Sequence, residues 1–86
     1  MNRIEWSTKA YRQLRKLRNP QAAEAIFDAV GSLASWPDCK DVKHLTNHEY
    51  QYRLRVGRYR VFFDVGEKTI TIITVQEVKK RDERTY

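Results

Sequence analysis

The sequence predicts an α+β domain in which a helical hairpin packs on a mainly antiparallel four-stranded sheet, in the order β-α-α-β-β-β. Three observations carry this prediction. Residues 2–6 alternate between apolar and polar side chains, as a strand does. Residues 8–35 then repeat apolar side chains at helical spacing, with a break at Asn19-Pro20. Residues 50–78 return to alternation, interrupted by glycines that permit turns.

Length and charge limit the possible functions. The 86 residues are expected to form one domain, residues 1–86, with a modest core. The formal net charge of +6 favours nucleic acid, an acidic protein or an anionic membrane surface as the partner. Membrane is the weakest of these, because no apolar run approaches the roughly 20 residues of a spanning helix. The single cysteine, Cys39, cannot form an internal disulfide, so we expect a cytoplasmic protein.

The first half of the chain predicts a short strand followed by two helices. Ser7 is the expected N-cap of a first helix that runs from Thr8 to about Leu17. Pro20 fits the first position of a second helix, which runs to about Ser35 and carries a broad apolar stripe. The short connection between the two helices predicts an antiparallel hairpin. Periodicity does not place the first strand within the sheet.

The clearest alternation lies in residues 50–63, which we call the arginine hairpin. Gly57 supplies the positive φ that a tight turn between its two strands needs. One face of the two strands is apolar and carries Tyr52, Leu54, Val56, Tyr59, Val61 and Phe63. The opposite face carries Arg53, Arg55, Arg58 and Arg60. The pattern therefore predicts one face for a core and one face suited to phosphate.

The segments around the arginine hairpin are simpler. Residues 36–49 are expected to be a polar connection. His44 and His48 lie four residues apart in it, with no third ligand in view, so we interpret them as solvated loop histidines. We accordingly expect no metal site and no cofactor. Residues 69–78 are rich in Ile, Thr and Val on both faces, which predicts a central strand covered on both sides, and a basic tail follows.

The candidate functional residues are basic and aromatic. The candidate phosphate ligands are Arg53, Arg55, Arg58, Arg60, Lys79, Lys80, Arg81 and Arg84. Arginine grips phosphate with a planar fork of N–H donors, and tyrosine can stack on an unpaired base, so together they suit RNA or another single strand. An equally weighted interpretation makes the strand arginines only the solvated face of a sheet. Tyr52 and Tyr59 follow the apolar phase and are expected in the core.

The chain resembles the toxins of the RelE/ParE superfamily from bacterial type II toxin–antitoxin systems. The resemblance rests on the run 52–56, on the run 57–61, and on the closing Lys80-Arg81 with the late Tyr86. The order of these pieces, together with the order of the predicted elements, covers nearly the whole chain. The resemblance implies a RelE-like fold over residues 1–86 and a cognate antitoxin as partner.

The resemblance also implies an activity. RelE-type toxins are ribosome-dependent endoribonucleases, or mRNA interferases, which inhibit translation without a metal. In their reaction the 2′-hydroxyl of the RNA attacks the neighbouring phosphate, leaving a 2′,3′-cyclic phosphate and a free 5′-hydroxyl. The implied partners are then the ribosome with its rRNA, the mRNA, and the antitoxin.

The family's site residues map onto named positions of this chain. By resemblance, Arg60 and Arg81 stabilise the charge of the transition state, and Tyr86 accepts the proton of the 2′-hydroxyl. The resemblance makes Arg81 the proton donor; Lys80 is a physical alternative, because arginine holds its proton beyond about pH 12. Arg53 and Arg55 hold the flanking phosphates. They replace strand lysines of the family, and the spacing from Arg81 to Tyr86 is one residue shorter than in RelE itself.

Two other functions remain open from the sequence. A ParE-like inhibitor of DNA gyrase would share the fold but would need no RNA-cleaving cluster. A non-catalytic nucleic-acid-binding module would need only the charge and the tyrosines.

Overall fold

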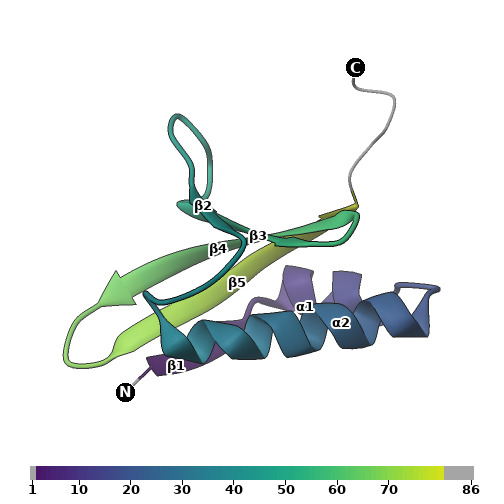
Figure 1. The fold of residues 1–86 in the computed structure, drawn as a ribbon, viewed down its shortest axis with the longest axis horizontal. Helices are drawn as coiled ribbons and strands as arrows, with labels where there is room; N and C mark the ends of the chain where they lie inside the picture. The colour runs from purple at the N-terminus through teal and green to yellow at the C-terminus, as the bar shows by residue number, and fades with distance from the viewer. Residues whose placement is uncertain (1, 81–86) are drawn as a thin grey trace.

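The chain forms a mixed five-stranded sheet with two helices packed against it (Figure 1). This computed structural model describes residues 2–80. The elements are β1 (Asn2–Trp6), α1 (Thr8–Arg15), α2 (Pro20–Gly31), the 3₁₀ helix η1 (Ser32–Ser35), β2 (Val42–His44), β3 (Tyr52–Val56), β4 (Tyr59–Glu67) and β5 (Thr71–Lys80). The strand order is β1-β5-β4-β3-β2, so the predicted α+β class is confirmed.

The sheet has one strand more than the sequence predicted. β2 lies in the stretch expected to be a polar connection, and it pairs antiparallel with β3 through Val42 opposite Leu54. Three residues are too few to show alternation, so the strand depends on pairing with β3 rather than on its own pattern. β1, whose place was open, lies at the other edge and pairs parallel with β5.

The helices begin where the sequence predicts. Ser7 Oγ accepts a hydrogen bond from the Ala10 N–H at 3.0 Å, and Asn19 Oδ1 accepts one from the Ala22 N–H at 3.1 Å. Both caps satisfy donors that have no partner inside the helix. The expectation of a single second helix to about Ser35 is corrected, because the α-helix ends at Gly31 and continues as the 3₁₀ turn η1.

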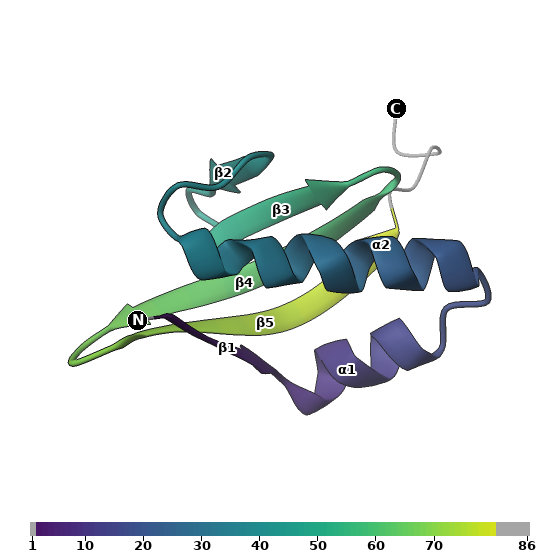
Figure 2. The same ribbon diagram turned by 60° about the horizontal axis from the view of Figure 1, so that its bottom comes forward.

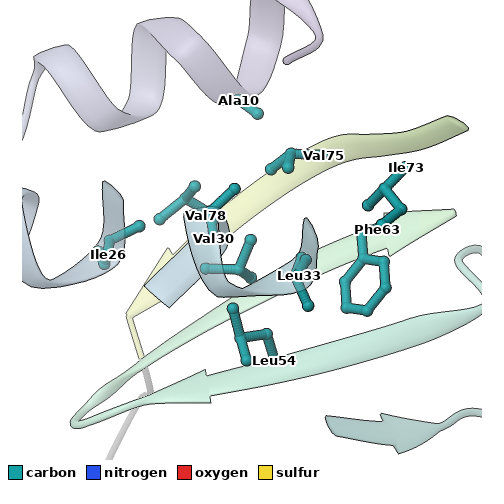
Figure 3. Packing of buried hydrophobic residues seen from close by; sticks show 10 residues of the cluster. Ala10, Ile26, Val30, Leu33, Leu54, Phe63, Ile73, Val75 and Val78 are labelled. Carbon is teal, nitrogen blue, oxygen red and sulfur yellow. The ribbon is translucent and has the colours of Figure 1, made fainter. Parts of the chain in front are cut away.

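The hydrophobic core lies between the helices and one face of the sheet (Figure 3). Ile26 and Val30 of α2 belong to the same buried cluster as Leu54 and Phe63 of the sheet. The remaining fully buried positions of this cluster are Ala10, Leu33, Val61, Ile73 and Val75. No helix within residues 2–80 covers the other face of the sheet, which we call the open face; it carries Arg53, Arg55, Arg60, Phe62, Glu77 and Lys79.

β5 is a central strand, as predicted. The helices of residues 2–80 cover only one of its two faces, which corrects the expectation that both are covered. β5 lies between β1 and β4, and it starts at Thr71 rather than at residue 69 because Lys68 N bonds Ile70 O in the preceding turn. None of the helices in residues 2–80 is long and apolar enough to cross a membrane.

α1 takes the place of a strand beside the second half of β5 (Figure 2). β1 pairs with β5 only as far as Val75. Beyond that point Ser7 Oγ donates to Gln76 O at 3.1 Å, and Gln13 Oε1 accepts from the Val78 N–H at 2.6 Å. The side chains of α1 therefore satisfy backbone groups that would otherwise form an unpaired edge.

Candidate nucleic-acid interface

Strand pairing brings three cations into one row across the open face. Arg55 on β3 is opposite Arg60 on β4, and Arg60 is opposite Lys79 on β5. Directly opposed residues on neighbouring strands have Cβ atoms roughly 5 Å apart, so the three charges are neighbours. We call Arg55, Arg60 and Lys79 the cation row. The alternation predicted the face of the two arginines, and the register adds Lys79.

Arg53 lies one step along β3 from the cation row, on the same face. A small hollow of about 50 Å³ opens here, lined by Arg53, Arg55, Gly57, Arg58 and Arg60. Gly57 has φ 57°, the turn conformation for which glycine was expected. Within residues 2–80, no carboxylate lies in ion-pair contact with Arg53, Arg55, Arg60 or Lys79. Their positive charge is therefore available to an anion.

The Arg53 side chain contains a buried polar atom without a partner. Its Nε is buried and makes no hydrogen bond within the part of the chain that the structure describes. A buried donor left unpaired costs roughly 1–3 kcal/mol. An anion seated among the arginines would supply acceptors for such donors.

A loop forms a wall on the open face beside these cations. It connects β2 to β3 and rises from the sheet on the side opposite the helices (Figure 1). The His48 ring stacks on Phe62 with ring centroids 5.1 Å apart, and Tyr50 lies 5.8 Å from the same ring. Gln51 N donates to Asp64 Oδ1 at 2.8 Å, which fixes the end of the loop. Sequence alternation gave no sign of this wall.

The two histidines differ in their surroundings. His44 is the last residue of β2 and not a loop residue, which corrects the expectation, and its ring lies 5.1 Å from that of Tyr52. His48 does lie in a loop, where its Nδ1 accepts from Tyr50 N at 3.0 Å. Within residues 2–80, no three His, Cys, Asp or Glu side chains form a group that could hold a metal ion.

A carboxylate lies next to the cation row, and the sequence did not single it out. Glu77 is opposite Phe62, and Lys9 Nζ reaches its Oε1 at 3.4 Å from α1. The Glu77 side chain is only 12% exposed. Its carboxylate raises the pKa of Lys9, while burial, followed by the charge of Glu49, raises the pKa of Tyr50. Residues 9 and 77 meet only because α1 lies along β5, and no local pattern encodes that contact.

The other predicted site residues are distributed as follows. Lys80 is opposite Tyr59, on the helix side of the sheet, so it does not join the cation row. There it borders a groove of about 410 Å³ between the start of α2 and the arginine hairpin. Arg58 is exposed in the turn and lines both this groove and the arginine hollow. Arg81, Arg84 and Tyr86 lie outside the described residues.

Residues 4–84 match the family model of the ParE toxin of the type II toxin–antitoxin system parDE. The chain belongs to this toxin family. The match covers nearly the whole chain, so the ParE-family toxin domain includes both the helices and the sheet. The earlier resemblance to the RelE/ParE superfamily is thereby confirmed.

Solved structures show the same fold for this ParE-family toxin. The RelBE2 toxin–antitoxin complex of Mycobacterium tuberculosis contains a chain 23% identical, with TM-score 0.73, covering 92% of this chain and 96% of that chain. A YoeB/ParE toxin from Agrobacterium tumefaciens is 12% identical, with TM-score 0.72 and coverages of 93% and 99%. The RelB–RelE complex of Methanococcus jannaschii gives 18% identity, TM-score 0.68 and 88% of each chain. A comparison with curated proteins gave no match.

Proposed function

We propose that this toxin is an endoribonuclease that cuts mRNA on the ribosome without a metal. The observation that supports this best is the cation row together with the neighbouring Arg53. The cations of the row have no carboxylate in ion-pair contact within residues 2–80, and the buried Nε of Arg53 has no hydrogen-bond partner there. A phosphodiester in the arginine hollow would meet planar guanidinium donors from two strands. The 2′-hydroxyl of the RNA would attack the adjacent phosphorus and expel the 5′-oxygen, leaving a 2′,3′-cyclic phosphate.

The cation row would act on the transition state of this reaction. Negative charge accumulates on the non-bridging oxygens as the phosphorane forms. Arg60, in the middle of the row, would stabilise that charge, while Arg53 and Arg55 hold the flanking phosphates. Donors fixed in place before the reaction lower its barrier because they need no reorganisation during it. Removing one such donor typically costs about 100-fold or more in rate.

Two proton transfers complete the proposed reaction. The 2′-hydroxyl must lose a proton as it attacks, and the departing 5′-oxygen must gain one. Tyr86 is the proposed acceptor and Arg81 the proposed donor, both on the resemblance to RelE-type toxins. Lys80, the other donor considered from the sequence, is opposite Tyr59 on the helix side of the sheet and does not line the arginine hollow, so we do not assign it this role.

Inhibition of DNA gyrase is the second candidate. The matching family model is that of ParE toxins, which favours this alternative directly. Inhibition of gyrase would not require the arginine hollow to bind a phosphodiester or to catalyse its cleavage.

One pair of assays separates the two candidates. Primer extension on a translated message should show new 5′ ends when the purified toxin is added to ribosomes, and none when ribosomes are omitted. Gyrase supercoiling should be unaffected at the same toxin concentration. Inhibited supercoiling without message cleavage would overturn the ribonuclease proposal.

A cognate antitoxin is the proposed protein partner. The Mycobacterium tuberculosis and Methanococcus jannaschii structures are both toxin–antitoxin complexes. Given the net charge of +6, we expect a partner with acidic or apolar segments that cover the basic surface. Co-expression with the product of the adjacent gene should yield a tight complex and relieve growth arrest; independent elution of the two proteins would count against this partner.

A further inference from the structure

The charged flank of α1 has no part in the proposed reaction. Residues 8–18, which comprise the first helix and the three residues after it, contain no acidic side chain. They carry five exposed cations: Lys9, Arg12, Arg15, Lys16 and Arg18. A helix with this much positive charge on a small domain indicates an anionic partner. The position of the helix in the fold then shows where that partner would lie.

Two contacts establish which flank of α1 lies beside the open face. Lys9 reaches Glu77 on that face, and Gln13 reaches the Val78 N–H at the edge of β5. Successive residues turn by about 100° around a helix, so Arg12 and Lys16 share the flank of Lys9. By the same turn Tyr11 and Arg15 fall on the opposite side of the helix, where the Arg15 guanidinium lies 5.8 Å from the centroid of the Tyr11 ring.

Lys16 lies at the level of the cation row. The contact between Gln13 and Val78 gives a common reference point on α1 and β5. Three residues further along α1 is about 4.5 Å, and one residue further along β5 is about 3.3 Å. Lys16 and Lys79 are therefore nearly level on adjacent elements, and the row continues from the sheet onto the helix.

Lys9 does not add free charge to this path. Its ammonium already neutralises the Glu77 carboxylate at 3.4 Å. Within residues 2–80, Arg12 and Lys16 have no carboxylate in ion-pair contact. Of the three cations on this flank, these two are the ones that can meet phosphates.

We propose that the cation row and the α1 flank form one continuous track for a single strand of RNA. The track runs from Arg55 and Arg60 through Lys79 to Lys16 and Arg12, across the edge of the sheet. It spans about 10 Å across β3 to β5 and about another 10 Å across α1. Several nucleotides would be needed to fill it. This inference rests on the proposed binding of RNA at the open face.

The test compares short and long RNA. The probes are unstructured, fluorescently labelled RNAs of about 4 and about 16 nucleotides, lengths that bracket the usual site sizes for single strands. They carry 2′-O-methyl groups, so the toxin cannot cleave them. Affinity is measured by anisotropy over a range of salt. Each phosphate neutralised adds about 0.7 to the slope of log affinity against log salt. Lys16→Gln and Arg12→Gln should each lower this salt slope by about 0.7 for the long RNA. Neither variant should change the slope for the short RNA.

Matched controls separate the track from general charge. Arg18→Gln removes an exposed cation outside the flank, so it should leave the slope unchanged. Arg60→Ala should weaken both RNA lengths. Equal slope losses for Lys16→Gln and Arg18→Gln would overturn the track, as would equal affinity for both lengths, and the proposed function would survive either result. Failure of both RNAs to bind would reject the proposed function and the track together.

Discussion

Arg53 shows a conflict between stability and function at a single residue. Its Nε is buried and has no hydrogen-bond partner among the described residues, although the same side chain borders the arginine hollow. A folded protein gains nothing from such a donor unless a ligand satisfies it. We therefore interpret Arg53 as a residue whose position serves binding at some cost to folding.

Substituting Arg53 by methionine should separate the two effects. Arg53→Met keeps an unbranched apolar stem and removes the unpaired donor, so the free energy of unfolding should rise by about 1 kcal/mol. Affinity for RNA should fall. Urea unfolding and RNA anisotropy measure the two quantities. Arg55→Met, at an exposed position, should change stability by less than about 0.5 kcal/mol. A clear loss of stability in Arg53→Met would contradict this interpretation.

Lys9, Tyr50 and Glu77 form a cluster through their electrostatic interactions, and this cluster predicts a pH dependence of stability. The pKa values of Lys9 and Tyr50 are both raised in the folded state. The folded protein therefore holds these protons more tightly than the unfolded chain, and stability falls as pH rises. The contribution is complete below about pH 10 and is lost above it, as the folded-state groups titrate.

Tyr50→Phe should flatten this alkaline loss. Unfolding by urea, followed from about pH 8 to about pH 12, covers the range in which both groups lose their protons. The wild-type protein should lose stability more steeply than the variant. Glu77→Gln should also flatten the curve, because it removes the carboxylate that raises the pKa of Lys9. Superimposable curves for all three proteins would show that the cluster does not contribute.

At the scale of elements, the sequence predicted the helices and strands whose residue pattern is visible within a short stretch of the chain. The Ser7 cap, the start of the second helix at Pro20, the arginine hairpin and the face of its strand arginines follow from local residue types and spacing. β2 was missed because three residues cannot show a period, and the parallel position of β1 depends on contacts with β5. The wall was missed for the same reason, since His48 meets Phe62 only after the sheet forms.

The contact between α1 and β5 is the element-scale feature most open to test. Gln13 Oε1 accepts from the Val78 N–H at 2.6 Å, where β1 no longer pairs with β5. Gln13→Ala leaves that donor without its partner and should lower the free energy of unfolding by about 1 kcal/mol. Gln13→Glu keeps an acceptor and should retain most of the stability. Equal effects of the two variants in urea unfolding would show that the hydrogen bond is not the cause.

For the whole molecule, one face of the sheet packs against the helices and stabilises the fold, and the other face is the proposed binding surface. Apolar side chains meet the helices on one face, and the other face stays open and carries the cation row. The helices differ in charge as well, since α1 has only basic charged residues while α2 carries Glu24 and Asp28. The open face and the adjoining flank of α1 thus both present positive charge that a polyanion can reach.

Sequence alone predicted the fold class and part of the site. Arg53, Arg55 and Arg60 could be assigned to one face because alternation is a local property. Lys79 and Lys80 are neighbours in the chain, yet only the register shows that Lys79 belongs to the row and Lys80 to the opposite face. The carboxylate of Glu77 required the full tertiary arrangement.

The most direct test of the cation row is message cleavage by toxin with and without Arg60. Primer extension on translating ribosomes should show cleavage by the wild-type protein, and Arg60→Ala should reduce its rate by about 100-fold while the fold stays intact. Arg18→Gln, which removes an exposed charge that is not part of the row, should cleave at the wild-type rate. Cleavage by Arg60→Ala as fast as by the wild-type protein would contradict the role assigned to the open face.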